Sequence, residues 1–421
     1  MAAPASAAVS FGSVSASEPH DRLWRDLKRS QRAAQLRAIG LILPLVVFLI
    51  LVFIVPIGML LSRSVSDLAV PRALPATVAA LAGWTPAKEI PPQVYPALVE
   101  DIGSAPQMLF GDAAARLETG TPGMRALMMK TRSRLQGAAP SDARKALTGI
   151  SPKWDTMEGW VAIKQASGPL TDHYLLTALD LHRDELGKVT RVVAYERVFL
   201  AAIGRTFGIA FTVTALALLL GFPFAFLAAT SSDRVSRILL FTVLLPFWTA
   251  MLVRALSWSV LLQRTGIIND ALLRLGLVRE PLDLMYNRFA LCIALIHIFL
   301  PYMVLPLYSV MKTIPPQHMR AAASLGARPW MAFRRVYLPQ VVPGIGAGAL
   351  LVFIQCLGVF VVPALLGGPN DQGLPYYIAF YVNRVLNWGL AAALSVILLL
   401  SVAVLYALYV RLSGKSAMVL G

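Results

Sequence analysis

Six long apolar runs constrain this chain more than any other feature of its sequence. Each has about 20 residues or more, which is the length that an α-helix needs to cross the hydrocarbon core of a bilayer. The expected spans are Ile39–Leu61, Phe199–Thr230, Ile238–Leu262, Phe289–Val310, Ile345–Leu366 and Trp388–Val410. The pattern predicts an all-α integral membrane protein with six transmembrane helices.

The composition points to the same class. Of the 421 residues, 57% are hydrophobic and only 14% are charged, a balance that soluble domains rarely reach. The formal net charge of +16 invites a nucleic-acid interpretation. The basic residues cluster beside apolar runs, however, where cytoplasmic retention charges are expected. The two cysteines, Cys292 and Cys356, fall inside apolar runs and cannot alone form a disulfide framework or a metal cluster.

Residues 1–38 form a basic segment that we expect on the cytoplasmic side. Its first part is rich in Ala and Ser, which is typical of disorder. Two interpretations of the basic part stand: an amphipathic helix on the inner membrane face, or a cluster of charges that fixes topology. We interpret residues 39–61 as the first span rather than a signal peptide. The apolar run is too long for a signal peptide, and no small-x-small cleavage site follows it.

Residues 66–195 have a mixed polar and apolar composition, and stretches such as DAAARLETG and SDARKALTG have helical character. A segment of roughly 130 residues is large enough for a small domain. We therefore expect a mostly helical, extracytoplasmic insert between the first and second spans. It contains Trp154, Trp160, His173 and His182 without any metal-ligand spacing, and the sequence assigns it no chemistry.

Residues 199–410 are expected to hold spans two to six. With a basic amino terminus inside, six spans return the tail of residues 411–421 to the cytoplasm. The basic connector SSDRVSR then also lies inside, as the positive-inside rule prefers. One loop argues against this topology, because residues 263–288 would lie outside although they carry four arginines.

The stretch Arg320–Pro339 predicts a compact docking element on the cytoplasmic side. Gly326 supplies the left-handed turn that often ends a helix, and Pro329 suits the first turn of a second helix. We expect Pro339 to end that second helix. One face of the second helix carries Trp330, Phe333 and Tyr337. The basic residues of the stretch, which contains no acid, are Arg320, Arg328, Arg334 and Arg335.

The few polar residues within the spans are functional candidates, because burying them in lipid is costly. Arg254 stands out as either a residue that lines a translocation pathway or one that snorkels to the outer interface. Trp248 and Trp258 are either further pathway residues or packing and interface anchors. For His297 and Gln355 we expect hydrogen bonds between helices.

No hydrolase, kinase or redox motif is present. The sequence has no Walker-type phosphate loop, no His/Glu zinc helix, no G-x-S-x-G motif and no pair of intramembrane Asp residues. We therefore expect no catalytic residue, no bound metal and no cofactor.

The docking stretch resembles the EAA signature of binding-protein-dependent ABC importer permeases. That signature reads Glu-Ala-Ala, three residues, Gly, nine residues, a β-branched residue, one residue and then Leu-Pro. The matching positions are Ala321, Ala322, Gly326, Val336, Leu338 and Pro339. Where the family has Glu at the first position, this chain has Arg320, which reverses the charge.

This resemblance implies a fold and a set of partners. The loop of residues 312–343 would be the coupling helix that sits in a groove of a cytoplasmic ATPase, and Arg320 and the matching residues would contact it. Residues 199–410 would be a permease core of the type I importer fold. One such chain is half a pore. The resemblance therefore implies a second permease, which is a related but different chain, and a periplasmic solute-binding protein. The complex would lie in a bacterial inner membrane, and only its ATPase would be an enzyme.

The substrate is less constrained. The segment LLPFWTAMLVRALSWSVLLQRTGIIN resembles spermidine/putrescine-type permeases, which implies a polyamine such as putrescine or spermidine. The six spans contain no Asp or Glu, so their charge does not support a polycation. The insert of residues 66–195 also departs from the short first loop that is usual in that subfamily.

Two other function classes compete with a transporter. A membrane-anchored sensor with residues 66–195 as an extracytoplasmic ligand-binding domain would explain the insert. It would not explain the closely connected spans that follow, and we see no cytoplasmic output domain after Arg411. A membrane-embedded enzyme would need paired acids, a histidine cluster or a nucleophile within the spans, which the sequence does not show. Co-purification with a soluble ATPase separates the importer from both.

Overall fold

The computed structural model describes residues 39–86, 88–135, 141–184, 187–194 and 197–417, with side chains as far as Arg411. The expectations for the basic segment of residues 1–38, and for the last residues of the tail, 418–421, lie outside the described residues. The chain divides into two units, residues 1–60 and residues 61–421.

The described part of the first unit is helical, and the helix Ile39–Ser62 is long and apolar enough to cross a membrane. It contains a π-helical turn, η1 (Ile50–Ile54), followed by α2 (Val55–Ser62). Pro56 explains the irregularity, because its missing N–H leaves the carbonyl of Val52 without the usual helical donor.

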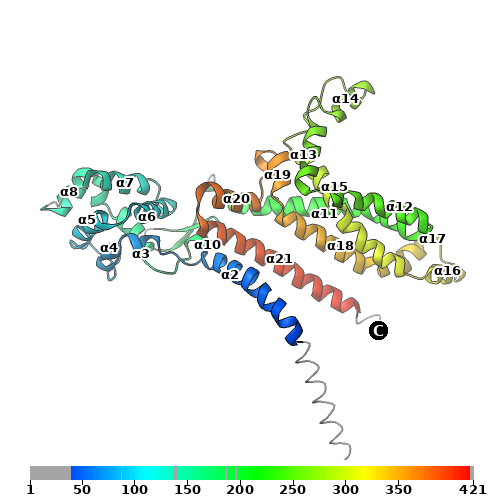
Figure 1. Cartoon of the computed structure of the whole chain (residues 1–421), viewed down its shortest axis with the longest axis horizontal. Helices are drawn as coiled ribbons and strands as arrows, with labels where there is room; N and C mark the ends of the chain where they lie inside the picture. The colour runs from blue at the N-terminus through cyan, green and yellow to red at the C-terminus, as the bar shows by residue number, and fades with distance from the viewer. Residues whose placement is uncertain (1–38, 87, 136–140, 185–186, 195–196, 418–421) are drawn as a thin grey trace, which may run out of the picture. The chain divides into compact units, whose positions relative to one another are not determined.

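Three helices form the centre of the membrane part of the second unit: α11 (Phe199–Thr230), α15 (Arg288–Thr313) and α18 (Leu338–Gly358). They pack against one another in one apolar core (Figure 1). Small residues bring α18 close to α15. Gly344 and Gly348, spaced as in the G-x-x-x-G motif of membrane helix pairs, are both buried at this contact.

Five helices are long and apolar enough to span a membrane, or six if one bent pair is counted as a span, within the described residues. The five are Ile39–Ser62, Phe199–Thr230, Arg288–Thr313, Pro329–Gly358 and Trp388–Arg411. The last lies within α21 (Trp388–Ala417). The mostly helical membrane fold is therefore confirmed, and the prediction for Phe199–Thr230 matches α11 residue for residue.

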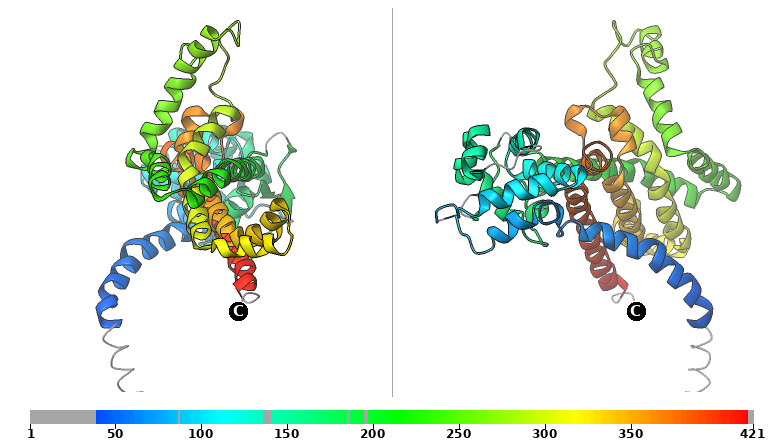
Figure 2. Two further views of the ribbon diagram at one scale, coloured as in Figure 1. Left: turned by 90° about the vertical axis from the view of Figure 1, so that its right-hand side faces the viewer. Right: turned by 60° about the vertical axis from the view of Figure 1, so that its left-hand side comes forward.

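The predicted span Ile238–Leu262 is not one straight helix. The chain forms α12 (Asp233–Leu244), the 3-10 turn η4 (Leu245–Trp248), α13 (Met251–Leu262) and α14 (Ile267–Arg274). The two halves are bent by 98° at the break after Trp248. Pro246 in η4 and extended backbone at Thr249 and Ala250 interrupt the helix. As a result, α13 leads to α14 at the end of an arm that projects from the bundle (Figures 1 and 2).

The expected span Ile345–Leu366 also has different bounds. A continuous helical segment runs from Pro329 to Gly358, and a separate helix, α19 (Val361–Leu366), follows it. The prediction that Pro339 ends a helix is wrong. Pro339 lies inside this continuous segment, at the start of α18 and directly after the π-helical turn η5 (Phe333–Tyr337), where the hydrogen-bond register of the helix changes.

The segment between the first two spans is mostly helical, with a small hairpin. Its helices are α3 (Ala69–Ala73), α4 (Pro75–Ala80), α5 (Val94–Ser104), α6 (Gln107–Gly120), α7 (Met124–Leu135), α8 (Ala143–Ile150), η2 (Pro152–Asp155), α9 (Met157–Gln165) and α10 (His173–Thr177). The strands β1 (Leu181–Arg183) and β2 (Val189–Arg191) pair antiparallel. Trp154 and Trp160 are fully buried at its core, and the indole N–H of Trp160 donates to the carbonyl of Trp154 over 3.1 Å. These two tryptophans are therefore core residues.

The same segment contacts the membrane helices at its carboxyl end. Tyr174 of α10 packs with Leu390 and Leu394 of α21 in a small apolar cluster. The carboxylate of Asp180 accepts hydrogen bonds from three backbone N–H groups at the start of α11, those of Val198, Phe199 and Leu200. Two further short elements, α20 (Leu374–Phe380) and η7 (Tyr381–Val385), precede α21, and η6 (Pro369–Asp371) precedes α20.

Candidate functional site

The docking stretch forms a helix, a tight turn and a second helix. The first helix is α16 (Pro316–Ser324), and α17 (Pro329–Ala332) begins the second. Gly326 has φ +81°, so the predicted left-handed turn is confirmed. The N–H of Ala327 donates to the carbonyl of Ala322 over 3.0 Å, and the N–H of Gly326 donates to that of Ala323 over 2.9 Å. This pair of bonds is the Schellman arrangement, which satisfies carbonyls at a helix end.

Aromatic stacking fixes the second helix against the bundle. The rings of Trp330 and Phe333 are stacked at 5.8 Å, and those of Phe333 and Tyr337 at 5.6 Å. The predicted common face is therefore confirmed. Phe226 of α11 meets Phe333 and Tyr337 edge-on, at 6.0 Å and 5.5 Å between centroids. The loop is thus held to α11, a central helix of the bundle.

A hydrogen bond ties the first helix of the loop to α18. The Nδ1 atom of His318 and the Oε1 atom of Gln340 are 2.9 Å apart, and the Gln340 amide N–H donates to the carbonyl of Val336. Together with the stack, this bond attaches both helices of the loop to the bundle.

The predicted coupling residues differ in exposure. Those that are exposed are Arg320, Ala321, Gly326 and Pro339, and those that are half-buried are Ala322, Val336 and Leu338. Two large apolar side chains at the tip are mostly exposed to solvent: Leu325 is 88% exposed and Trp330 is 70% exposed. The sequence pattern identified the turn but not these two side chains as its most prominent surface.

A second polar cluster lies between α13 and α15. Arg254 and Trp258 are one helical turn apart on α13 and both contact α15. The Trp258 indole N–H donates to the Nδ1 atom of His297 over 3.2 Å, and a guanidinium nitrogen of Arg254 lies 3.4 Å from the carbonyl oxygen of Ile298. The predicted hydrogen bond of His297 between helices is confirmed. The Nε atom of Arg254 is buried without a hydrogen-bond partner among the described residues.

The structure does not bring all the predicted pathway residues together. Trp248, in η4, is 87% exposed and takes no part in the Arg254 cluster. Gln355, for which we expected a hydrogen bond between helices, is exposed on α18 and forms no such bond within the described residues. The cluster is therefore Arg254, Trp258 and His297.

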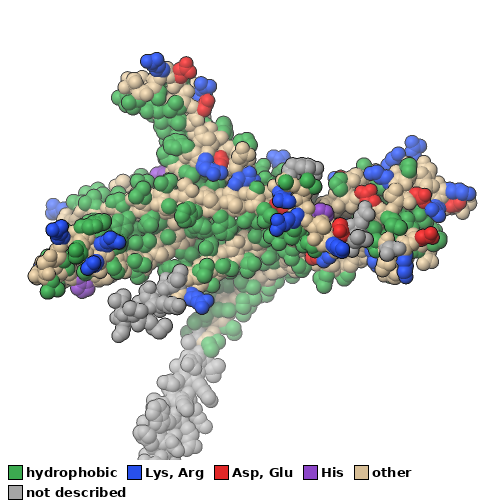
Figure 3. Space-filling model, turned by 180° about the vertical axis from the view of Figure 1, so that it is seen from behind, with side chains coloured by type: hydrophobic (Ala, Val, Ile, Leu, Met, Phe, Trp, Pro, Cys, Tyr) green, Lys and Arg blue, Asp and Glu red, His purple; other side chains and the backbone are tan. Residues whose placement is uncertain are grey.

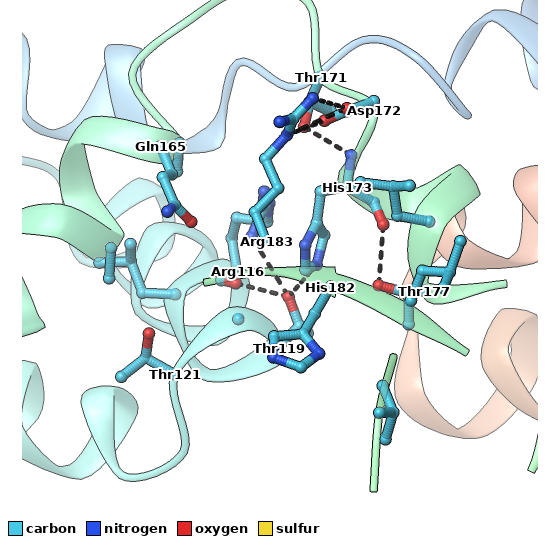
Figure 4. A pocket seen from close by; sticks show the side chains of 17 residues that line it. Arg116, Thr119, Thr121, Gln165, Thr171, Asp172, His173, Thr177, His182 and Arg183 are labelled. Atoms are coloured by element: carbon cyan, nitrogen blue, oxygen red, sulfur yellow. Dashed lines mark hydrogen bonds and ion pairs between the residues drawn. The ribbon is translucent and has the colours of Figure 1, made fainter. Parts of the chain in front are cut away.

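The insert contains a pocket that the sequence did not reveal (Figure 4). It encloses about 130 Å³, and its walls come from α6, α9, α10 and β1. Arg116, Thr119 and His173 lie close together in it, and the Arg183 side chain extends toward Asp172 (Figure 4). The Oγ1 atom of Thr119 lies 3.0 Å from the Nε2 atom of His173.

The charges of this pocket are internally paired. Arg116 forms a buried ion pair with Asp67, and Arg183 pairs with Asp172. Hydrogen bonding from Arg183 is the main reason why the pKa of Asp172 is lowered. Burial, and next the charge of Arg116, lower the pKa of the His173 imidazole from its ordinary 6.5 to about 3. The pocket therefore offers neutral polar groups and no free acid for a cation.

No group of three or more His, Cys, Asp or Glu side chains is arranged to hold a metal ion within the described part of the chain. Cys292 and Cys356 are both buried and free.

Comparison with known proteins identifies the family to which the membrane core is similar. Residues 198–416 match the family described as the binding-protein-dependent transport system inner membrane component. That segment is more than half of the 421 residues. The chain belongs to this family. It is accordingly a multi-pass inner membrane protein and a permease subunit of an ABC importer, not an enzyme.

Several curated relatives resemble the permease. It is 38% identical over 200 residues to the spermidine/putrescine transport system permease protein PotB of Haemophilus influenzae. This match covers 47% of this chain and 69% of the relative. To PotB of Escherichia coli it is 32% identical over 228 residues, covering 54% of this chain and 82% of the relative. To the molybdenum transport system permease protein ModB of Mycobacterium bovis it is 32% identical over 193 residues, covering 45% of this chain and 70% of the relative.

Among solved structures, a bacterial alginate ABC transporter in complex with an alginate pentasaccharide-bound periplasmic protein is similar to the permease. The sequence identity is 20% and the TM-score 0.44, and the match covers 52% of this chain and 80% of the solved one.

Proposed function

We propose that this permease forms half of the translocation pathway of an ABC importer and couples it to a cytoplasmic ATPase through the loop of residues 312–343. The observation that carries the proposal is the helix–turn–helix at Gly326. Its Schellman turn sits at the glycine of the EAA-type motif, and its tip is exposed. A tip whose two helices contact α11 and α18 is suited to passing a movement of the ATPase to the spans.

The remaining arrangement follows from this assignment. Residues 1–38 and 411–421 lie in the cytoplasm with the loop, and residues 66–195 lie outside, where a periplasmic solute-binding protein docks. Residues 199–410 form a permease core of the type I importer fold. A second permease, related to this chain but different from it, completes the pore. The broken segment α12–α13 counts as one span in this topology.

The proposed substrate is a small solute, and a polyamine such as putrescine or spermidine is the first choice. The support is the likeness to PotB proteins, which carry that substrate in their names. The five continuous span helices contain no Asp or Glu. Acidic groups for a polycation would therefore come from the second permease or from the binding protein. Arg254 and Trp258 are the proposed pathway residues of this chain, with His297 beside them.

The experiment that tests the proposal is co-expression of the full-length chain with a candidate ATPase, second permease and binding protein. We expect the four to co-purify, and proteoliposomes that contain the complex to take up radiolabelled putrescine or spermidine only with ATP and the loaded binding protein. A chain that purifies without any ATPase would contradict the coupling role. ATP-dependent uptake of a different solute would contradict the polyamine assignment alone.

The family match favours this function over the membrane-anchored sensor. It covers the spans that follow the insert, which a sensor does not explain. The pocket beside His173 is the feature that a sensor would need, and it lies outside the matched residues.

A further inference from the structure

The coupling loop has a surface of one charge sign. Residues 312–343 contain five basic residues and no acid. Lys312 lies 3.6 Å from Asp233 of α12, which partly offsets its charge. The other four are exposed, and none of them forms an ion pair within the described part of the chain: Arg320, Arg328, Arg334 and Arg335. Figure 3 shows basic side chains, with no acidic one among them, at the end of the bundle that α16 and α17 form.

Two exposed apolar side chains lie in the same loop as the basic ones. Leu325 and Trp330 flank the turn at Gly326 and are the most exposed apolar side chains of the loop. The Trp330 ring is stacked on Phe333, and Leu325 is the residue at which α16 ends. An apolar centre with a charged rim is the usual anatomy of a protein-binding surface.

Arg320 adds a positive charge to this surface at a position that the family motif defines. It occupies the first position of the motif, where the family pattern has Glu. A groove that accepts a carboxylate there would repel a guanidinium, because like charges placed together at an interface are costly. A guanidinium instead needs an acceptor, and a carboxylate is the group that it binds most strongly, with two parallel hydrogen bonds.

We propose that the ATPase partner of this permease presents a carboxylate to Arg320, within an acidic rim around an apolar depression that takes Leu325 and Trp330. This inference rests on the proposed coupling function and adds the chemistry of the partner. Its consequence is pairing specificity. The permease assembles with its own ATPase and rejects one whose groove is built for Glu at this position.

A protein partner fits these features better than a lipid surface. Anionic headgroups would satisfy the arginines, but they would not require rigid apolar side chains at the centre of the patch. The Schellman turn defines the backbone between Leu325 and Trp330, and the stack on Phe333 orients the Trp330 ring, as docking into a shaped groove requires.

The test compares four full-length chains, each co-expressed with the ATPase that co-purifies with the wild-type complex: wild type, Arg320→Gln, Arg320→Glu and Arg279→Glu. Arg320 is exposed and without an ion pair, so these changes preserve folding. Arg279 is the matched control, because it is an exposed arginine in the loop after α14, away from the coupling stretch. Titration of ATPase onto the immobilised complexes at low and high NaCl measures association.

We expect Arg320→Glu to weaken ATPase binding by about tenfold or more, and Arg320→Gln to weaken it less. Salt should weaken the wild type more than Arg320→Gln. Arg279→Glu should bind as the wild type does. Reversing one acid of the ATPase to Lys should restore binding to Arg320→Glu but not to the wild type, which identifies the facing carboxylate.

Failure of the inference is distinguishable from failure of the proposed function. A wild-type chain that captures no ATPase overturns the coupling function itself. An ATPase that binds wild type and Arg320→Glu equally, with no dependence on salt, overturns only the acidic groove. Loss of binding to phosphatidylglycerol vesicles by Arg320→Glu, with unchanged ATPase affinity, assigns the basic rim to lipid and also overturns the inference.

Discussion

Met303 of α15 leaves no room for a side chain on Gly348 of α18. A Cβ atom at Gly348 would lie 2.9 Å from the Met303 sulfur and 3.0 Å from its carbonyl oxygen. Because one of the two is a backbone atom, rotation of the methionine cannot remove the clash. This contact limits how far apart the helices α15 and α18, which lead into and out of the loop of residues 312–343, can be placed.

Gly348→Ala should therefore destabilise the permease, although alanine is the better helix former. We expect a cost of about 1–3 kcal/mol from overpacking, measured as a lower midpoint of thermal unfolding in detergent. Gly208→Ala is the matched control, since Gly208 lies within α11 and a Cβ there meets nothing within 4 Å. That change should leave stability equal or raise it by up to about 1 kcal/mol. Equal effects of the two substitutions would contradict the close packing.

Gly326→Val should uncouple transport, because the turn has φ +81° and a β-branched residue is strained there by about 1–3 kcal/mol. A Cβ at Gly326 meets nothing within 4 Å, so the penalty comes from the backbone alone. Gly326→Asn should then be much milder, since asparagine tolerates the left-handed region. The measurement is uptake together with the ATPase activity that the loaded binding protein stimulates.

A second glycine gives the control for this turn. Gly276 has φ +66°, also with open space around it, and lies outside the coupling loop. Gly276→Val should lower stability by a similar amount and leave binding of the ATPase unchanged. If both valine variants lost the ATPase equally, the effect at Gly326 would be general unfolding rather than loss of the docking surface.

The local chemistry of the coupling turn could be predicted from the sequence, whereas the course of the neighbouring helices could not. A glycine after an alanine-rich stretch defines a helix end whatever surrounds it, and Gly326 does have the expected conformation. The effect of Pro339 was misjudged because a π-helical turn before it changes the hydrogen-bond register and lets the helix continue into α18. Hydropathy likewise gave no sign of the 98° bend after Trp248.

The polar sites depend on contacts between distant segments, which a single sequence does not show. Arg254 stood out from the sequence because charge within an apolar run is rare. The pairing of Trp258 with His297 joins two helices 39 residues apart. In the insert pocket, the partner of Arg116 is Asp67, 49 residues earlier. None of these residues carries a spacing that marks the pair, so the pocket could only be found in three dimensions.

Trp258→Phe should reduce transport more than Trp248→Phe. The first change removes the indole N–H that bonds His297, at a net cost of about 0.5–1.5 kcal/mol. Trp248 is 87% exposed and forms no such bond with any residue that the structure describes, so its replacement should leave uptake within error of the wild type. Uptake rates and unfolding midpoints of both variants, and of Trp258→Phe combined with His297→Ala, provide the check. A non-additive double variant supports the contact, and full additivity contradicts it.

The insert should lose stability as the pH falls below about 6.5. The pKa of His173 is lowered from 6.5 to about 3 in the folded protein, so between these values the unfolded chain binds a proton that the folded one does not. The stability that the neutral His173 imidazole contributes is therefore complete above pH 6.5 and is lost progressively toward pH 3. Thermal unfolding at pH 7.5 and pH 5 should show a smaller drop for His173→Gln than for wild type. His182→Gln, in the same pocket, is the control. An unchanged drop in His173→Gln would show that the imidazole is not kept neutral by its surroundings.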